Sequence, residues 1–386
     1  MNIINSIKKR FFSFFKKQNI YNNRCLNIQE IVKYSPSVIL YLSGNKTSAY
    51  QGNMWFKVLE RLDAKVAIVL REEEINKGLD KTTLPIYLCK TLRDLEYLEI
   101  NGVKTILYPS HTNKVAQSLR LYRLNHYFIN HGESDKIVNQ TKLLMAYDKL
   151  LVAGPIAKKR IVDAKIPLRE GQVEFVGRPQ LEFSLNKCDD SIQNKKILNI
   201  LYAPTWEGFV EEANYSSINQ YGLDMIIELM KNENIIIYFK AHPFTGRIKN
   251  SNPSQYIHKI RNILENTKHF IIDDEKDIHE YMNISDIMIT DISSTIADYL
   301  FTMKPMILTN PRSQNQEDIN SIYYSSNATY FLEKAEDINL LVLDIKAKDG
   351  MLSQRKEISL DILGNIPKGS MLKFNQIINE SLKDEE

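Results

Sequence analysis

The sequence is poor in cysteine and contains neither a long apolar run nor a glycine-rich nucleotide-binding motif. Its three cysteines, Cys25, Cys89 and Cys188, are scattered without CxxC spacing, which argues against a zinc site or a disulfide framework and suits a reducing cytoplasm. GxGxxG and GxxxxGKS/T are both absent, so a dinucleotide-dependent dehydrogenase and a P-loop kinase are disfavoured. No cluster of His, Asp and Glu has a spacing that compels a metal. The sequence therefore requires no divalent metal and indicates no certain cofactor.

Net charge is small and unevenly distributed. The chain carries 50 Lys and Arg against 47 Asp and Glu, a balance of +3, which is too little to indicate a nucleic-acid partner. The N-terminal segment, in contrast, contains cations and no acid. Its cations are Lys8, Lys9, Arg10, Lys16, Lys17 and Arg24.

We expect residues 1–24 to form a short basic amphipathic helix that associates with a membrane surface. In a helix, one face would carry Ile4, Ile7, Phe11, Phe14 and Phe15, a pattern typical of segments that lie in an anionic lipid interface. The apolar run is far shorter than the ~20 residues that a membrane crossing needs. It also lacks a small-residue cleavage site, so a secretory signal is disfavoured. A packing helix or a disordered basic tail is the alternative.

Short β-rich runs alternate with helical patterns through the rest of the chain, which predicts α/β domains with parallel sheets. Strands of a first domain, within 25–185, are expected at 37–42, 65–70, 85–89, 105–108, 127–130, 149–153 and 173–176, with helices at 54–62 and 139–147 among them. A polar stretch at 186–196 is typical of an interdomain linker. Strands of a second domain, within 197–386, are expected at 197–203, 235–240, 269–272, 286–290 and 306–308. In doubly wound sheets, ligands bind beyond the carboxyl ends of the strands. We therefore expect the two domains to enclose a cleft, with the residues that follow the strands lining it.

The stretch 285–311 has the clearest local organisation. Its strand stops at Asp291 and turns through Ser293 and Ser294 into an apolar helix predicted to end near Met303. Either serine is well placed as the N-cap. The unpaired N–H groups and partial positive charge of a helix start, together with two hydroxyls, suit a phosphate. An ordinary capped helix is the alternative.

Other polar turns follow the expected strands. His131 lies at a strand end before a glycine, and a histidine with a pKa near neutrality suits a general base. Lys240 and His242 stand two apart at the end of an extended run, so both can face one side and hold a diphosphate. Thr205 lies in a Pro-Thr turn. Each residue has an alternative role. His131 is then a structural histidine, Lys240 and His242 form a solvated strand end, and the Pro-Thr turn of Thr205 is only a rigid turn.

Four motifs, in this order, resemble those of the CDP-glycerol glycerophosphotransferases, the polyol-phosphate transferases and polymerases of teichoic acid and capsule synthesis. They are HGxxxK at 131–136, LYAPTW at 201–206, KAHP at 240–243 and TDISSTIADYLFTMKP at 290–305. YQGN at 50–53 and VGRP at 176–179 are similar to further family landmarks.

The resemblance implies a GT-B fold of two Rossmann-like domains, in a cytoplasmic protein held peripherally on the inner face of the bacterial cell membrane. It implies transfer of glycerol phosphate or another polyol phosphate from a CDP-linked donor, with release of CMP. The acceptor would be a hydroxyl of a cell-surface polysaccharide or of a lipid-linked molecule. One alternative is a GT-B glycosyltransferase that uses a nucleotide sugar in capsule or lipopolysaccharide synthesis. Another is a catalytically inactive scaffold subunit.

The same resemblance implies roles for individual residues. His131 would be the base that deprotonates the acceptor hydroxyl, and His242 would contact the donor diphosphate. Donor-side contacts are expected from Ser293, Ser294, Lys240, Thr205, Asp291 and Thr295. Acceptor-side or supporting positions are Gly132, Glu133, Asp135, Lys136, Gln51 and Asn53.

Overall fold

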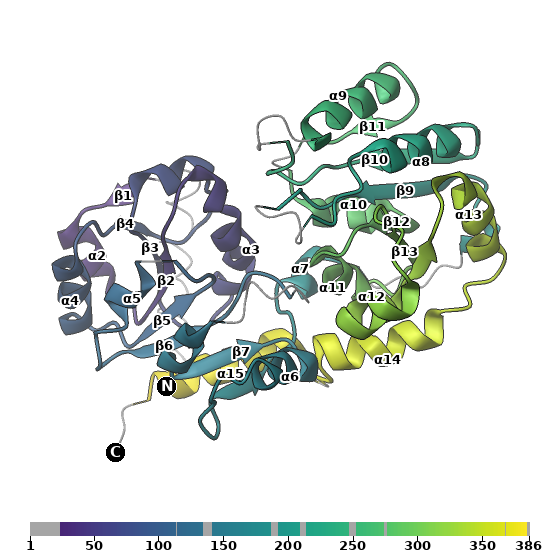
Figure 1. The fold of residues 1–386 in the computed structure, drawn as a ribbon. Helices are drawn as coiled ribbons and strands as arrows, with labels where there is room; N and C mark the ends of the chain where they lie inside the picture. The colour runs from purple at the N-terminus through teal and green to yellow at the C-terminus, as the bar shows by residue number, and fades with distance from the viewer. Residues whose placement is uncertain are drawn as a thin grey trace, which may run out of the picture.

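The protein contains two parallel β-sheets with helices packed on them (Figure 1). This computed structural model describes residues 24–112, 114–133, 141–186, 192–208, 214–246, 252–273, 276–366 and 368–383. Except for Arg24, the basic segment expected at 1–24 lies outside the described residues. None of the helices in the described part combines the length and the apolar character that a bilayer crossing requires.

The first sheet has eight strands in the order β1-β4-β3-β2-β5-β6-β7-β8. Their bounds are β1 Cys25–Leu26, β2 Val38–Leu42, β3 Val66–Leu70, β4 Ile86–Leu88, β5 Thr105–Tyr108, β6 Asn125–Phe128, β7 Lys149–Val152 and β8 Val173–Phe175. The helices of this half are α2 Ile28–Tyr34, α3 Tyr50–Leu59, α4 Leu92–Ile100, α5 Val115–Ser118, α6 Pro155–Asp163 and α7 Leu181–Ser184. The central strands β2 and β3 are continuous apolar runs, buried at every position, as expected where helices cover both faces of a parallel sheet.

The second sheet has six strands in the order β11-β10-β9-β12-β13-β14. Their bounds are β9 Leu198–Ala203, β10 Ile235–Phe239, β11 Phe270–Ile271, β12 Ile287–Thr290, β13 Met306–Thr309 and β14 Tyr330–Leu332. The helices that follow the linker are α8 Gln220–Met230, α9 Asn252–Leu264, α10 Ile278–Ile284, α11 Thr295–Leu300, α12 Gln316–Ile322, α13 Ile338–Ala347, α14 Leu352–Leu363 and α15 Ser370–Ser381. Short 3-10 turns complete the connections at η1 Lys46–Ser48, η2 Glu73–Gly78, η4 Lys142–Ala146, η5 Ile192–Asn194, η7 Tyr324–Ala328 and η8 Ala335–Asp337.

Several expected elements differ from the observed ones at their ends. The strand expected at 127–130 is β6, which starts and ends two residues earlier because Asn130 takes a left-handed φ of 54° that stops the extended chain. Of the helix expected at 139–147, the described part is the 3-10 turn η4. Helix α11 ends at Leu300, before Met303, whose φ of 62° is also left-handed. The short edge strands β1 and β14 were absent from the sequence prediction.

Each sheet has one topological switch point, where successive crossovers leave in opposite directions along the sheet. In the first sheet this point lies between β2 and β5, and in the second it lies between β9 and β12. Loops diverge there beyond the carboxyl ends of the strands and leave a crevice for ligands. The turns that contain the predicted site residues Thr205 and Ser293 follow β9 and β12 directly.

The last helix returns to the first half of the protein, as the yellow ribbon in Figure 1 shows. Phe374, Ile377 and Ile378 of α15 have the i, i+3, i+4 spacing of one helix face and belong to the buried core under β2 and β3. The Phe374 ring lies 5.3 Å from the ring of Trp55 in α3. Helix α15 therefore packs on the first sheet, although it lies in the range 197–386 expected for the second domain.

Helix α14 reaches α6 at a close backbone contact that needs glycine on both sides. A Cβ built on Gly154 would lie 2.6 Å from the amide nitrogen of Gly364, and Gly364 has a φ of 76°. A larger residue at either position would force these two backbone segments apart.

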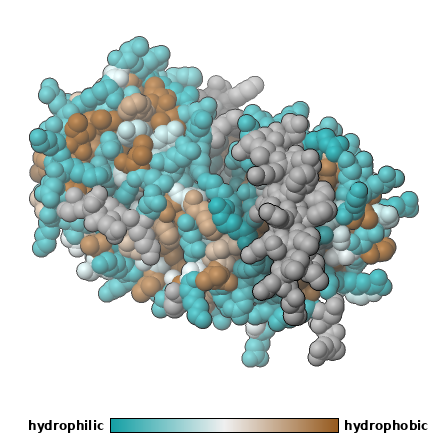
Figure 2. Space-filling view, turned by 180° about the vertical axis from the view of Figure 1, so that it is seen from behind, coloured by the Kyte–Doolittle hydropathy of each residue, from teal (hydrophilic) through white to brown (hydrophobic). Residues whose placement is uncertain are grey.

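Large apolar side chains are mostly enclosed, and the exposed ones are dispersed. Seen from the side opposite to Figure 1, apolar groups form separate small areas within a polar surface (Figure 2). Tyr122 and Ile100 are the most exposed of the large apolar residues described, at 81% and 75%.

Candidate active site between the two halves

His131 lies just beyond β6, in a turn held by Asn130. The Asn130 side chain accepts a hydrogen bond from the His131 amide (2.8 Å) and donates one to the Gly132 carbonyl (2.7 Å). The Trp55 indole N–H donates to the Asn130 carbonyl (2.8 Å). These hydrogen bonds stabilise the left-handed backbone of Asn130. They also fix the position from which the imidazole of His131 projects.

The imidazole of His131 has a defined tautomer when neutral. Its Nδ1 lies 2.7 Å from the Pro109 carbonyl oxygen, which can only accept, so Nδ1 carries the proton and Nε2 the lone pair. Burial lowers the pKa of His131 and the Arg178 charge lowers it further, against the opposing effects of the Pro109 hydrogen bond and the Asp298 charge. The edge of the Tyr50 ring lies against the imidazole, with centroids 5.8 Å apart. His131 is therefore a neutral base at pH 7, with Nε2 as the basic atom.

A buried ion pair joins the two halves beside His131. The Arg178 guanidinium, after β8, donates to Asp298 of α11 at 2.9 Å, and the two side chains are only 5% and 10% exposed. His279 Nε2 of α10 lies 3.5 Å from the other carboxylate oxygen of Asp298. Burial acts to raise the pKa of Asp298, but Arg178 and His279 outweigh it and hold this pKa below its usual value. The carboxylate is thus charged and links the first half to the second.

The Ser293–Ser294 turn faces the His131 turn across this interface. A Cβ built on Gly132 would lie 3.5 Å from the Ser294 Cβ. Ser294 is the N-cap of α11, as predicted, but its side chain makes no capping hydrogen bond. The Ser293 hydroxyl lies 2.6 Å from the Thr295 hydroxyl. The Ser293 and Thr295 hydroxyls also lie 3.3 Å and 3.0 Å from the buried Thr290 hydroxyl. Ser294 is thus the hydroxyl residue of this turn that the structure places next to the His131 turn.

Asp291 holds the loops of the second switch point together. It is 1% exposed, and its carboxylate accepts hydrogen bonds from the backbone amides of Thr205 (2.8 Å) and Ser217 (3.1 Å). The Thr309 hydroxyl donates to its other oxygen. Burial raises the pKa of Asp291, although these hydrogen bonds oppose the rise. Asp291 and the buried Thr205 therefore position the turns after β9, β12 and β13 from inside the protein.

His242 packs among aromatic rings beyond β10. Its ring is nearly parallel to that of Trp206, with centroids 6.2 Å apart, and lies 5.4 Å from that of Phe244. The His242 Nδ1 accepts a hydrogen bond from the Phe244 amide at 3.1 Å. Lys240, two residues earlier, is 5% exposed. The contact with Trp206 brings the turns after β9 and β10 together on the second sheet.

Two expected supporting residues hold the first half together. Glu133 is buried, accepts from the Ala153 amide at 3.2 Å and pairs with Arg160 at 2.7 Å. The side-chain amide of Asn53 donates a hydrogen bond to the Gly78 carbonyl (3.0 Å), and its oxygen accepts one from the backbone N–H of Asp80 (3.1 Å). Both side chains thus fasten loops of the first half.

The remaining expected supporting residues are Gln51, Asp135 and Lys136. Gln51 is half-buried in the first turn of α3. Asp135 and Lys136 lie outside the described residues.

Three residues near His131 had no role in the sequence analysis: Tyr50, Arg178 and Asp298. A signal for two of them exists, because Asp298 is a lone acid in the apolar helix that follows the Ser-Ser turn, and Arg178 is a lone cation in VGRP. A buried charge requires an opposite partner. Which partner it takes is visible only in the structure.

Among the described residues, no group of three His, Cys, Asp or Glu side chains is arranged to hold a metal ion. Charges near His131 come instead from Arg178 and Asp298.

Two parallel α/β sheets, whose turns after β6 and β12 meet at Gly132 and Ser294, and a C-terminal helix that returns to the first sheet define the GT-B class of folds. The wall teichoic acid polymerase TagF has a similar solved structure, with a TM-score of 0.57 at 14% identity over 91% of this chain and 90% of that one. MnaA of S. aureus, solved with UDP, is similar with a TM-score of 0.55 at 12% identity, over 90% of this chain and 97% of the other. At these identities the likeness concerns the fold alone.

The family follows from sequence comparison. The model of the CDP-Glycerol:Poly(glycerophosphate) glycerophosphotransferase family matches residues 123–350, more than half of the chain, and the chain belongs to this family.

Two curated relatives are similar over part of the chain. Teichoic acid ribitol-phosphate polymerase TarL of Staphylococcus aureus (strain NCTC 8325 / PS 47) is 25% identical over 154 residues, 39% of this chain and 25% of the relative. A teichoic acid poly(ribitol-phosphate) polymerase of Bacillus spizizenii (strain ATCC 23059 / NRRL B-14472 / W23) is 30% identical over 118 residues, 30% of this chain and 17% of the relative. The matched segments thus span a quarter or less of these relatives.

Proposed function

We propose that this protein transfers a polyol phosphate, glycerol phosphate or ribitol phosphate, from a CDP-linked donor to a hydroxyl of a glycopolymer or lipid-linked acceptor. The observation that carries the proposal is the placement of His131. Its Nδ1–H is committed to Pro109, which leaves Nε2 as the base, and Gly132 beside it meets Ser294 of the other half. A base on one sheet and a hydroxyl-lined turn on the other suit a transfer between two bound substrates.

The proposed reaction balances as a single displacement at phosphorus. His131 Nε2 takes the proton of the acceptor hydroxyl, whose oxygen attacks the phosphorus that bears the polyol. The bond from that phosphorus to the bridging oxygen breaks, and CMP leaves with the electron pair. The chain's task in such a reaction is to align the reactants and stabilise negative charge. We assign this task to the hydroxyls of Ser293 and Ser294 and to the donor-side residues His242 and Lys240.

The first test is nucleotide release by the purified protein. The panel contains CDP-glycerol, CDP-ribitol and UDP- and CMP-linked sugars, each with and without a polyol-phosphate acceptor. We expect CMP from one CDP-polyol, and only when acceptor is present. Release of UDP from a sugar nucleotide would replace the proposal by the glycosyltransferase alternative, and no release from any donor would favour the scaffold alternative.

We also propose that residues 1–17 hold the protein at the cytoplasmic face of the membrane, through the cations and apolar residues of that segment. A variant without residues 1–17 should remain in the supernatant when mixed with vesicles that contain anionic lipid, whereas the full chain should sediment with them. Neutral vesicles are the control. Equal sedimentation of both proteins with anionic vesicles would contradict the membrane role of this segment.

A further inference from the structure

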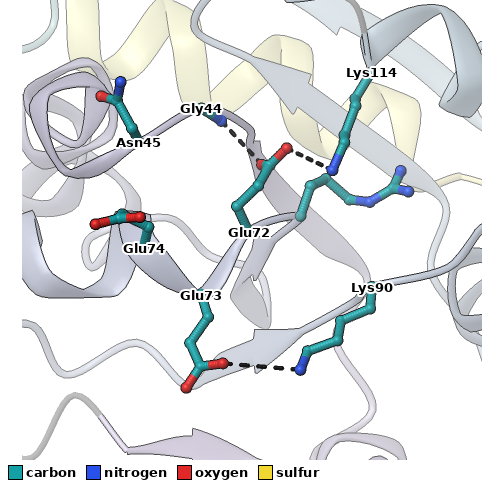
Figure 3. Close-up of a pocket in the computed structure, with 8 residues that line it drawn as sticks. Gly44, Asn45, Glu72, Glu73, Glu74, Lys90 and Lys114 are labelled. Carbon is teal, nitrogen blue, oxygen red and sulfur yellow. Dashed lines mark hydrogen bonds and ion pairs between the residues drawn. The ribbon is translucent and has the colours of Figure 1, made fainter.

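A cavity of about 490 Å³ opens beyond the carboxyl ends of β2, β3, β4 and β5 in the first sheet (Figure 3). It lies at the switch point of this sheet, where a ligand is expected, and its volume is in the range of small-molecule sites. Its charged lining residues are the cations Arg71, Lys90 and Lys114 and the carboxylates Glu72, Glu73 and Glu74. Among the described lining residues, the positive and negative charges therefore balance.

The charges of the cavity wall are also paired with one another. Glu72 lies 2.6 Å from Lys114 and accepts a hydrogen bond from the Gly44 amide at 2.9 Å, and Glu73 lies 3.8 Å from Lys90 (Figure 3). A phosphate would bring negative charge beside these carboxylates and compete with them for the same ammonium groups, which disfavours an anionic ligand. A cationic ligand would be disfavoured by the lysines in the same way.

A hydroxyl group fits this wall without any change in charge. It can donate to a carboxylate and accept from an ammonium group at the same time, so several hydroxyls can bridge the charged partners of the wall. Glu73 and Lys90 suit this role, because their side chains are 74% and 66% exposed and their separation of 3.8 Å is longer than a hydrogen bond. The cavity is thus suited to an uncharged ligand with many hydroxyls.

The back of the cavity is held in place and continues to His131. The Arg71 guanidinium donates to the Tyr41 hydroxyl at 2.8 Å, and this hydroxyl donates to the Lys114 carbonyl at 2.8 Å. Lys114 belongs to the loop after β5, and Pro109 of the same loop accepts the His131 Nδ1–H. One loop therefore positions both a wall of the cavity and the proposed base.

An exposed aromatic ring connects the cavity wall to His131 from the other side. Asn45 lines the cavity and caps η1, and Tyr50 begins α3 directly after this turn. Because a 3-10 turn rises about 2 Å per residue, Tyr50 lies on the order of 10 Å from Asn45, a distance that a short oligosaccharide spans. The Tyr50 residue is 41% exposed, and its ring lies 5.8 Å from the imidazole of His131. A flat aromatic ring provides an apolar face on which the C–H groups of a sugar ring can pack.

We propose that the cavity binds an uncharged sugar unit of the acceptor, next to the unit whose hydroxyl His131 deprotonates. A sugar combines the two features that the site matches, because it has many hydroxyls for the charged wall and a C–H face for Tyr50. The inference rests on the proposed function. It adds that the acceptor carries a neutral glycan beside its reacting end, and that an acceptor without this glycan leaves the cavity empty.

The test measures binding by saturation-transfer NMR, which requires no turnover. The probes are neutral disaccharides of glucose, galactose, mannose and N-acetylglucosamine, each titrated into the full chain, with a glycerol phosphate trimer as the charged comparison. The test variant combines Glu73→Ala with Lys90→Ala, which removes one charge of each sign. The control combines Lys159→Ala with Asp163→Ala, which removes an exposed ion pair of α6 in the same way. A third variant, Tyr50→Leu, removes the aromatic ring and keeps an apolar side chain.

We expect the wild type and the control to bind at least one disaccharide equally well. The Glu73/Lys90 variant should bind it at least about tenfold more weakly and Tyr50→Leu roughly threefold or more weakly. Binding of the trimer should be the same in the Glu73/Lys90 variant as in the wild type. In the transfer assay, the disaccharide should compete with the acceptor and leave the KM for the CDP-linked donor unchanged.

Three results would overturn the cavity assignment: no binding of any disaccharide by the wild type, equal binding by the Glu73/Lys90 variant, or a loss of trimer binding in that variant. Failure of the proposed function has a different signature. A wild type that binds a disaccharide but releases no CMP from any CDP-polyol would refute the proposed function and keep the cavity assignment.

Discussion

Replacing His131 by alanine is expected to lower the rate of CMP release by about 10²–10⁴, with little change in thermal unfolding. The variant removes the Nε2 lone pair that accepts the acceptor's proton, while the substrates still bind. Rates are measured with saturating donor and acceptor, and unfolding by circular dichroism. The matched control is His258→Ala, a histidine on the exposed side of α9. A His131→Ala protein with full activity would eliminate the proposed base.

The pH profile provides a second readout of the same residue. Only neutral His131 can accept a proton, so the rate should fall on the acid side as the imidazole is protonated. Since the folded protein lowers the pKa of His131 from its usual 6.5, the midpoint of this fall should lie below pH 6.5. The residual activity of His131→Ala should lack this acid limb. A wild-type profile that begins to fall well above neutrality would contradict the assignment.

Replacing Asp298 by asparagine is expected to lower the free energy of unfolding by about 3–5 kcal/mol, because it leaves the Arg178 guanidinium buried without its countercharge. The measurement is urea unfolding followed by tryptophan fluorescence. The control is Asp163→Asn, which breaks the exposed Lys159–Asp163 pair (2.8 Å) and should cost less than about 1 kcal/mol. Similar losses of unfolding free energy in the two variants would show that the buried Arg178–Asp298 pair stabilises the fold no more than an exposed pair does.

Two further measurements separate charge from packing at this pair. Arg178→Met combined with Asp298→Leu should recover part of the lost stability, because no buried charge is left unpaired. The pKa of Asp298 is lowered in the folded protein, so its contribution is present above the usual value of 3.8 and is lost as the pH falls through the lowered one. In Asp298→Asn, the acid limb of any remaining activity should also move to lower pH, because Asp298 raises the pKa of His131.

The positions of most strands along the chain, the two α/β halves and the turns that follow the strands could be predicted from the sequence, because these features depend on neighbouring residues. The order of the strands within each sheet was not predicted, because it depends on how distant segments pair. β2 and β3 are recognisable as short continuous apolar runs, and the Ser293–Ser294 turn follows such a run directly. The ends of elements were less predictable. Asn130 and Met303 stop their segments through left-handed backbone angles, which the surrounding structure imposes on residues that also fit extended or helical chain.

What the sequence by itself determined is therefore the fold class and the place of His131 and the Ser-Ser turn at strand ends. Only the tertiary structure decided which polar side chains are available for chemistry. Asp291 and Glu133 stand in the same turns as the candidate site, and Asn53 lies in helix α3, yet their hydrogen bonds hold other loops of the protein in place. Arg178 and Asp298 stand 120 residues apart in sequence. The physical reason is that the spacing of apolar residues along the chain indicates helices, strands and their buried faces. The partner of a buried charge depends instead on which elements pack together in the folded protein.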